Sequence, residues 1–134
     1  MPVIDSSVYV ALMNPNEAEH ASCWAWFENA KGGQEEIAAP LILLAETAAA
    51  LSRGVGNPDL ALRAIQLARN ASLIELAPVT LPLAERAASI AAQHRIRGCD
   101  AVYMALAEQL DTPLVTLDQQ QLERAVAIVQ AHKP

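Results

Sequence analysis

The chain has 134 residues, of which 53% are hydrophobic, and its formal net charge is −6 at pH 7. This length suits one domain with a substantial core, so we expect a single domain over residues 1–134. The negative charge argues against broad, non-specific binding of nucleic acid, which needs a basic surface. It does not exclude a nuclease, because a catalytic cluster of acids would itself contribute several negative charges.

The sequence contains no segment that predicts a membrane span or a signal peptide. The longest apolar stretch, residues 38–51, is shorter than the ~20 residues that a spanning helix needs, and it contains Glu46. The first residues lack the basic region of a signal peptide. Cys23 and Cys99 have no metal-binding spacing, so we expect two free thiols in a reducing, cytoplasmic setting.

In the first half of the chain, the pattern predicts helices separated by short strands. A strand over residues 2–4 is followed by a helix to about Met13, which Ser6 or Ser7 can cap. The remaining elements are a helix over 17–30 that ends at Lys31-Gly32-Gly33, a strand over 36–39, and a helix from Pro40 to Arg53 with Gly54 at its C-terminal cap.

The same alternation continues in the second half. The sequence predicts a helix over 58–70, a strand over 72–77, a helix from Pro82 to about Arg97 that Gly98 ends, a helix over 100–110, a strand over 114–117, a helix over 118–124 and an edge strand over 125–129. Such alternation predicts an α/β fold: a three-layer α/β/α sandwich with a mainly parallel sheet of about five strands.

In parallel sheets, ligands bind beyond the carboxyl ends of the strands, where the strand order reverses. Asp5 follows the first predicted strand and Asp118 follows the fourth. These two acids, more than a hundred residues apart, would meet if the first and fourth strands were neighbours.

Four acidic residues lie in unusually apolar surroundings: Asp5, Glu46, Asp100 and Asp118. A carboxylate in such surroundings must be hydrogen-bonded, paired or metal-bound. Few basic residues are close to these acids in sequence, so a divalent cation is the natural partner. Mg²⁺ prefers oxygen ligands, and a cation held by acids at strand ends indicates phosphate chemistry.

Each acid also has a purely structural explanation. Asp5, Asp100 and Asp118 stand where predicted helices begin, so each could serve only as an N-cap. Asp118 with Gln121 resembles a capping box. Glu46 is harder to explain in this way, because its helical neighbours three and four residues away are all apolar.

Other polar and aromatic residues give weaker indications of function. The histidines have no ligand spacing, and Tyr103 is expected in the core. Arg53, Arg95 and Arg97 could contact RNA phosphates or could be plain surface residues.

Four motifs together resemble a PIN domain, and among PIN domains the chain is most similar to the VapC-type toxin ribonucleases. The matching segments are Val3-Ile4-Asp5-Ser6-Ser7, Leu43-Leu44-Ala45-Glu46, Asp100-Ala101-Val102-Tyr103-Met104-Ala105-Leu106-Ala107 and Val115-Thr116-Leu117-Asp118. The resemblance implies Mg²⁺- or Mn²⁺-dependent endonucleolytic cleavage of RNA by metal-activated water. It also implies homodimers and inhibition by a cognate antitoxin protein.

By position, the resemblance makes Asp5, Glu46, Asp100 and Asp118 the acidic quartet, which we expect to be catalytic and to bind the metal. From its chemistry, Glu46 is also a candidate general base. Ser7 and Thr116 match the supporting hydroxyl positions. Some relatives carry a further acid shortly after the last aspartate, whereas glutamines occupy residues 119–121 here.

Two alternative functions fit the sequence less well. One is a catalytically silent PIN-like module that only binds. The other is a different metal-dependent phosphate-transfer enzyme, such as a haloacid-dehalogenase-like phosphatase. That class needs an Asp-x-Asp motif after the first strand, and Asp5 is followed by Ser6-Ser7.

Overall fold

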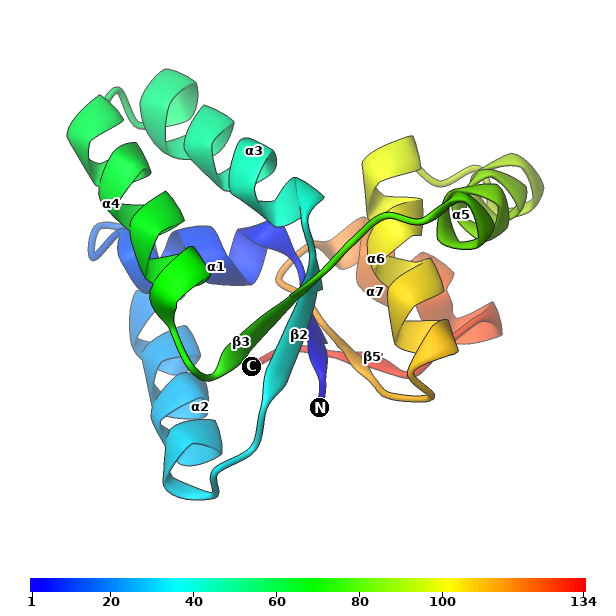
Figure 1. Ribbon diagram of the computed structural model, residues 1–134, viewed down its shortest axis with the longest axis horizontal. Coiled ribbons are helices and arrows are strands. Elements are labelled where there is room, and N and C mark those ends of the chain that lie inside the picture. Colours follow the sequence, from blue (N-terminus) through cyan, green and yellow to red (C-terminus); the bar gives the residue numbers. More distant parts are fainter.

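The computed structural model describes residues 1–134 and contains one five-stranded sheet between two layers of helices (Figure 1). The strand order is β3-β2-β1-β4-β5, and every neighbouring pair is parallel. The strands are β1 (Val3–Ile4), β2 (Ile37–Pro40), β3 (Ile74–Ala77), β4 (Leu114–Val115) and β5 (Ala131–His132). The predicted three-layer α/β class and the five parallel strands are confirmed.

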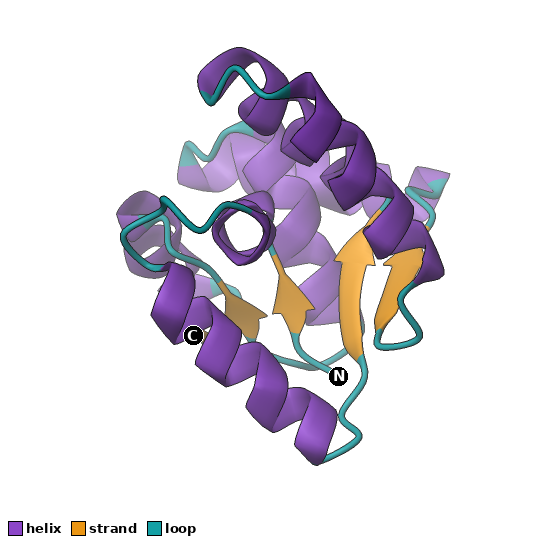
Figure 2. Ribbon diagram, turned by 90° about the vertical axis from the view of Figure 1, so that its left-hand side faces the viewer, coloured by secondary structure: helices purple, strands orange, loops and turns teal.

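The helices divide between the two faces of the sheet according to chain order. On one side lie α1 (Ser6–Met13), α2 (His20–Gly32), α3 (Ile42–Ala49), the π-helical turn η1 (Ala50–Gly54) and α4 (Pro58–Asn70). On the other side lie α5 (Leu81–His94), α6 (Gly98–Gln109), α7 (Gln119–Arg124) and the 3₁₀ turn η2 (Ala125–Ala127). The view in Figure 2 shows the strands side by side with helices before and behind them.

The adjacent inner strands β1 and β4 are completely buried. Val3, Ile4, Leu114 and Val115 have no exposed surface, as expected for parallel strands that are covered by helices on both faces. Helix α4 begins where the sequence indicates: Asn57 caps it through its side chain, and Pro58 occupies its first turn. The expected cap of the first helix by Ser6 or Ser7 was wrong, because Asp5 caps α1. None of the helices is long and apolar enough to cross a membrane, and both cysteines are free thiols.

The predicted helix from Pro40 was wrong at its start, because Pro40 is the last residue of β2 and α3 begins at Ile42. The backbone N–H groups of Ile37 and Leu41 bond towards β3, whereas that of Ala38 bonds to Pro2 beside β1. Successive backbone nitrogens of β2 therefore point alternately to β3 and to β1, and the nitrogen of Pro40 points to β1. The pairing of β1 with β2 is limited to Val3 and Ala38. A proline is tolerated there, because the ladder does not need its missing donor.

Two further boundaries differ from the prediction. Helix α5 ends at His94, with Arg95 in the left-handed conformation (φ 53°), and Gly98 opens α6 instead of ending α5. The predicted edge strand over 125–129 was also wrong, since the fifth strand is Ala131–His132. To pair in parallel with β4, the chain must return to the amino end of the sheet. The six residues of α7 rise only about 9 Å, so residues 125–130 complete the return.

Candidate active site

The strand order reverses between β1 and β4, which pair directly through Val3 with Leu114 and Ile4 with Val115. Their carboxyl ends therefore lie at the same edge of the sheet. Asp5 follows β1, and Thr116 to Asp118 follow β4. This is the location where open parallel sheets bind ligands.

Asp5 is 2% exposed and accepts four hydrogen bonds, all from neutral donors. Its Oδ1 accepts from Ser7 Oγ (2.5 Å) and the Val8 amide (3.3 Å), and its Oδ2 accepts from Thr116 Oγ1 (2.6 Å) and Gln121 Nε2 (2.8 Å). Burial raises the pKa of the Asp5 carboxyl, the hydrogen bonds from Ser7, Thr116 and Val8 oppose the rise, and the charge of Asp100 adds to it. An ionised Asp5 therefore lacks a positive partner in contact with it.

Asp100 and Asp118 are joined by one guanidinium group. Arg97 Nε donates to Asp100 Oδ2 at 2.7 Å, and Arg97 Nη2 donates to Asp118 Oδ2 at 2.9 Å. Asp100 Oδ1 also accepts from Gln121 Nε2 at 3.0 Å. Burial raises the pKa of Asp100, although the hydrogen bond and charge of Arg97 lower it.

Glu46 approaches the same place from α3. Its Oε1 accepts a 2.6 Å hydrogen bond from the hydroxyl of Tyr103, a buried residue of α6. Glu46 makes no hydrogen bond to the groups that hold the three aspartates together, but it lines the same cavity.

All four acids predicted from the sequence line one cavity of about 760 Å³. Its lining residues are Asp5, Ser6, Ser7, Val10, Glu17, Glu19, Glu46, Ala49, Ala50, Arg97, Gly98, Cys99, Asp100, Leu117, Asp118 and Gln121. A larger cavity of about 920 Å³ lies beside the amino ends of β4 and β5 and contains none of the four. Position at the carboxyl edge of the sheet, rather than size, identifies the candidate site.

The capping explanation holds for two acids without excluding another role. Asp5 caps α1, and Asp118 caps α7 by accepting from the Gln120 and Gln121 amides. Asp118 uses Oδ1 for the helix and Oδ2 for Arg97. Asp100 does not cap a helix, because α6 has Arg97 at its N-cap position and no side-chain cap.

Ser7 and Thr116 both bond to the Asp5 carboxylate. Each hydroxyl donates to Asp5, and each also accepts a backbone N–H: Ser7 from Leu117 and Thr116 from Asp118, both at 3.0 Å. These bonds fix the Asp5 carboxylate against the segment that carries Asp118.

Sequence reasoning missed three groups that contact the acids. Arg97 contradicts the expectation that few basic residues are close, and its spacing of three residues before Asp100 was the available signal. Gln121 does not complete the expected capping box, because its side chain bonds Asp5 and Asp100. Tyr103 is in the core as expected, but its hydroxyl reaches Glu46.

The chemistry of the donors suits a hard divalent cation, although their arrangement does not form a complete ligand set. As the side chains stand, no group of three or more His, Cys, Asp or Glu residues is arranged to hold a metal ion. Carboxylate oxygens of Asp5 and Asp100 nevertheless lie within 3.0 Å of one atom, Gln121 Nε2. These acids fit a cation such as Mg²⁺ in kind and location, provided that Gln121 and Arg97 shift.

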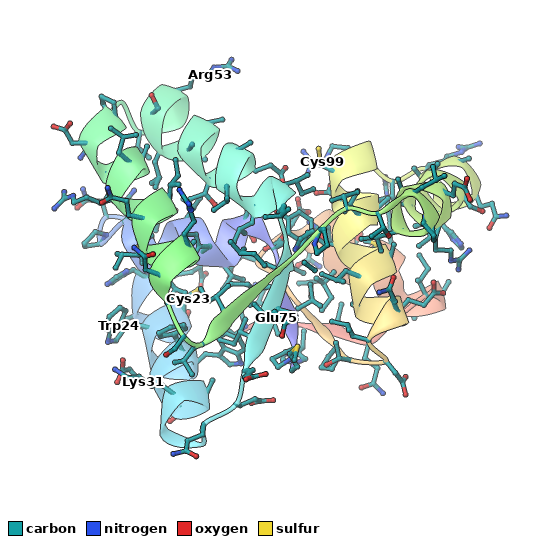
Figure 3. The ribbon with its side chains drawn as sticks, in the orientation of Figure 1. Cys23, Trp24, Lys31, Arg53, Glu75 and Cys99 are labelled. Atoms are coloured by element: carbon teal, nitrogen blue, oxygen red, sulfur yellow. The ribbon has the colours of Figure 1, made fainter.

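Other candidate groups do not offer a nucleophile. Cys99, labelled in Figure 3, lies at the start of α6 and lines the cavity. Burial and the charges of Glu46 and Asp100 raise the pKa of this thiol, which keeps it protonated at neutral pH. Arg53 lies at the outer end of η1 and does not line the cavity.

Comparison with known protein families shows to which family the chain belongs. The family model described as the PIN domain matches residues 3–127. The chain belongs to the PIN domain family. This confirms the family predicted from the four motifs.

Solved structures share the PIN fold over the entire chain. The toxin VapC20 of Mycobacterium tuberculosis, described as cleaving the sarcin–ricin loop, has a TM-score of 0.80 and 19% identity, with complete coverage of both chains. FitAcB from Neisseria gonorrhoeae has a TM-score of 0.71 and 23% identity, covering all of this chain and 98% of that one. FitAB bound to a DNA fragment has a TM-score of 0.70 and 21% identity, covering all of this chain and 95% of that one. No curated protein matches the chain in sequence.

Proposed function

We propose that this PIN domain is a divalent-metal-dependent endoribonuclease that acts as the toxin of a toxin–antitoxin pair. The observation that carries the proposal is the meeting of Asp5, Glu46, Asp100 and Asp118 in one cavity at the switch point of the sheet. They come from four segments that only the fold brings together.

Electrostatics supports a cation as the missing partner. Two carboxylates about 5 Å apart repel by on the order of 3 kcal/mol at an effective dielectric constant of about 20. Burial is the largest cause of the raised pKa values of Asp5 and Asp100, and a neighbouring carboxylate adds to each rise, so the ionised forms of both acids are disfavoured. A bound Mg²⁺ or Mn²⁺ would relieve this repulsion.

Each acid has a proposed role. Asp5 and Asp118 would hold the cation directly or through water, and Asp100 would complete the site and orient a water molecule. Glu46 would help to hold the site and accept a proton from the attacking water as general base. The cation, when bound, supplies a lowered pKa for its water and polarises the phosphoryl oxygen. Ser7 and Thr116 would keep the Asp5 carboxylate in place.

The substrate and partner follow from the resemblance to toxins. VapC20, which shares this fold, is described as cleaving the sarcin–ricin loop. We therefore propose RNA as the substrate, a cognate antitoxin protein as the inhibitor and a second copy of the chain as a dimer partner. The net charge of −6 is consistent with a requirement for a cation between these acids and RNA phosphates.

Thermal unfolding and RNA cleavage in the same buffers test this function. A cation at about 100 times its dissociation constant should stabilise the protein by ~2.7 kcal/mol relative to EDTA. Asp5→Asn and Asp118→Asn should abolish both this gain and cleavage. Asp59→Asn, which changes an acid in the first turn of α4, should leave both intact. Cleavage by both site variants at the parental rate would refute the assignment.

A catalytically silent binding module is the second candidate. It is favoured by the contacts of Arg97 and Gln121, which already occupy oxygens of Asp5, Asp100 and Asp118. A parent protein that binds Mn²⁺ but leaves every tested RNA intact would support this candidate over the nuclease.

A further inference from the structure

Gln121 joins two of the acids through a single nitrogen atom. It belongs to the short helix α7, and only 3% of the residue is exposed. Its Nε2 lies 2.8 Å from Asp5 Oδ2 and 3.0 Å from Asp100 Oδ1. A side-chain amide carries two N–H donors, so both can be used on carboxylates of the site.

The other end of the same amide accepts no hydrogen bond. Gln121 Oε1 is buried and has no partner. Leaving a buried acceptor unpaired costs about 1–3 kcal/mol, and such groups in folded proteins call for an explanation, of which a bound ion or water is one. Gln121 therefore offers the site an oxygen that the fold itself does not use.

An amide is suited to two opposite tasks at one position. Its N–H groups donate to carboxylates, whereas its carbonyl oxygen is a ligand type that Ca²⁺ accepts and a good acceptor for metal-bound water. The terminal torsion of glutamine has broad, roughly two-fold preferences. Rotation about it exchanges the two ends without moving the backbone of α7.

We propose that Gln121 is a member of the cation site: its Nε2 bridges Asp5 and Asp100 as in the structure, and its Oε1 turns towards the ion or an ion-bound water when a divalent cation takes over these carboxylates. The inference rests on the proposed metal dependence. It makes Gln121 a positioning residue for Asp5 and Asp100 and an oxygen donor to the cation or its hydration shell. Gln121 then supplies a neutral oxygen beside the acids.

The first experiment titrates the full-length protein with Mn²⁺ by calorimetry. Gln121→Met retains the length of the side chain and removes both the donor and the acceptor. If Gln121 contributes its oxygen, Mn²⁺ should bind about tenfold more weakly, the scale seen when groups that support metal ligands are removed. Gln120→Met is the matched control on the same helix, because the Gln120 side chain is exposed and makes no hydrogen bond to the acids. It should bind Mn²⁺ like the parent.

The direction of the change is decisive. If Gln121 only occupied the oxygens of Asp5 and Asp100, it would compete with the ion, and Mn²⁺ would bind equally or more tightly after its removal. Equal or tighter binding by Gln121→Met overturns the inference. So does an equal loss in Gln120→Met, because the loss would then not depend on the buried amide.

A second measurement uses the parent protein, so it does not depend on the folding of a variant. Side-chain NH₂ resonances of Gln121 and Gln120 are followed by NMR during titration with Mg²⁺. The Gln121 NH₂ signals should move and exchange faster with water as they leave the carboxylates, whereas those of Gln120 should not. Unchanged Gln121 signals, while the backbone signals of Asp5 and Asp100 shift, would overturn the inference.

The two hypotheses fail in different ways. A parent protein that neither binds Mn²⁺ nor cleaves RNA refutes the proposed function and this inference with it. A parent that does both, together with a Gln121→Met variant of unchanged Mn²⁺ affinity, refutes the inference alone.

Discussion

The hydroxyl of Thr116 lies 2.6 Å from Oδ2 of Asp5, although the two residues are 111 positions apart in the chain. Thr116 is completely buried, and its Oγ1 also accepts the backbone N–H of Asp118 at 3.0 Å. One side chain thereby connects the acid that follows β1 to the acid that follows β4. The pairing of β1 with β4 thereby fixes the positions of the Asp5 and Asp118 carboxylates relative to each other.

Replacing Thr116 by valine should destabilise the protein. The substitution keeps the shape of the side chain but removes a donor to Asp5 and leaves the Asp118 amide without its acceptor. Lost hydrogen bonds of this kind typically cost about 1–3 kcal/mol. Denaturation by urea in EDTA should show a reduced free energy of unfolding with an unchanged slope.

Thr47→Val is a control for Thr116→Val, because we expect the opposite effect on stability. It is also buried, at 1% exposure, but its Oγ1 has no hydrogen-bond partner. Thr47→Val removes an unsatisfied hydroxyl, so stability should stay the same or rise. Equal destabilisation by the two substitutions would mean that the Thr116 hydroxyl has no special part in holding Asp5.

Arg97→Gln should increase the affinity for Mn²⁺ or Mg²⁺. The guanidinium of Arg97 pairs with Asp100 and Asp118, so it competes with a cation for the same oxygens. A divalent ion about 6 Å from a unit positive charge experiences a repulsion of about 1.4 kcal/mol even at the dielectric constant of water, which corresponds to a tenfold change in affinity. Calorimetric titration of the variant measures this change.

Arg86→Gln is the matched control for Arg97. Arg86 pairs with Glu108 through two hydrogen bonds of 2.6 and 2.7 Å, and neither residue lines the cavity of the four acids. Its removal should not change cation affinity. If Arg97→Gln binds the cation no more tightly than the parent, the guanidinium is not a competitor.

Stabilisation by the cation should depend on pH. Burial raises the pKa values of Asp5 and Asp100 above 3.8 in the folded protein. Protonation of these groups therefore favours folding: the contribution is complete below their unfolded pKa and is lost as pH rises through the folded pKa. In EDTA, their contribution to the free energy of unfolding should decline above about pH 4.

A cation competes with protons for the same carboxylates, so the rise in melting temperature on adding Mg²⁺ should grow over that pH range. Glu108 has the opposite tendency, because Arg86 lowers its pKa and its contribution is lost as pH falls. Since Glu108 is outside the cavity, the difference between melts in Mg²⁺ and EDTA at each pH removes its effect. A difference that stays constant with pH would show that Asp5 and Asp100 do not bind the ion.

The sequence predicted the class of fold because that class depends on local patterns. Short apolar strands between helices imply a parallel sheet, and an acid after such a strand lies at its carboxyl edge. That reasoning brings Asp5 and Asp118 together only if the first and fourth strands are neighbours, and the pairing of β1 with β4 meets this condition. The resemblance to PIN domains, rather than spacing, assigned Ser7 and Thr116 to the site.

The errors arose where tertiary geometry decided the outcome. Residues 125–129 are apolar enough for a strand, but parallel pairing of β5 with β4 requires the chain to return first. The three consecutive glutamines of α7 are identical in type, and only the packing of this helix buries Gln121 while it exposes Gln119 and Gln120. The side chain that contacts two acids therefore could not be distinguished from its neighbours.

Tyr103→Phe should slow RNA cleavage while leaving the protein folded. The Tyr103 hydroxyl donates to Glu46 Oε1 at 2.6 Å, and burial together with the charge of Glu46 raises the pKa of the phenol, which keeps it a donor. Phenylalanine preserves the packing of the ring but frees the Glu46 carboxylate. If Glu46 acts on the attacking water, its loss of orientation should reduce the cleavage rate by ~10-fold, the scale of other lost supporting contacts.

Tyr9→Phe separates this positional effect from a loss of stability. Tyr9 is as deeply buried as Tyr103, at 2% and 1% exposure, and its hydroxyl donates to the Ala64 carbonyl, also at 2.6 Å. Both substitutions remove one short hydrogen bond of a buried tyrosine and should lower the free energy of unfolding by about 1–3 kcal/mol. Single-turnover cleavage at a temperature where both variants are folded should be slow only for Tyr103→Phe. Equal rates for the two variants would show that the Tyr103–Glu46 contact serves the fold and not the chemistry.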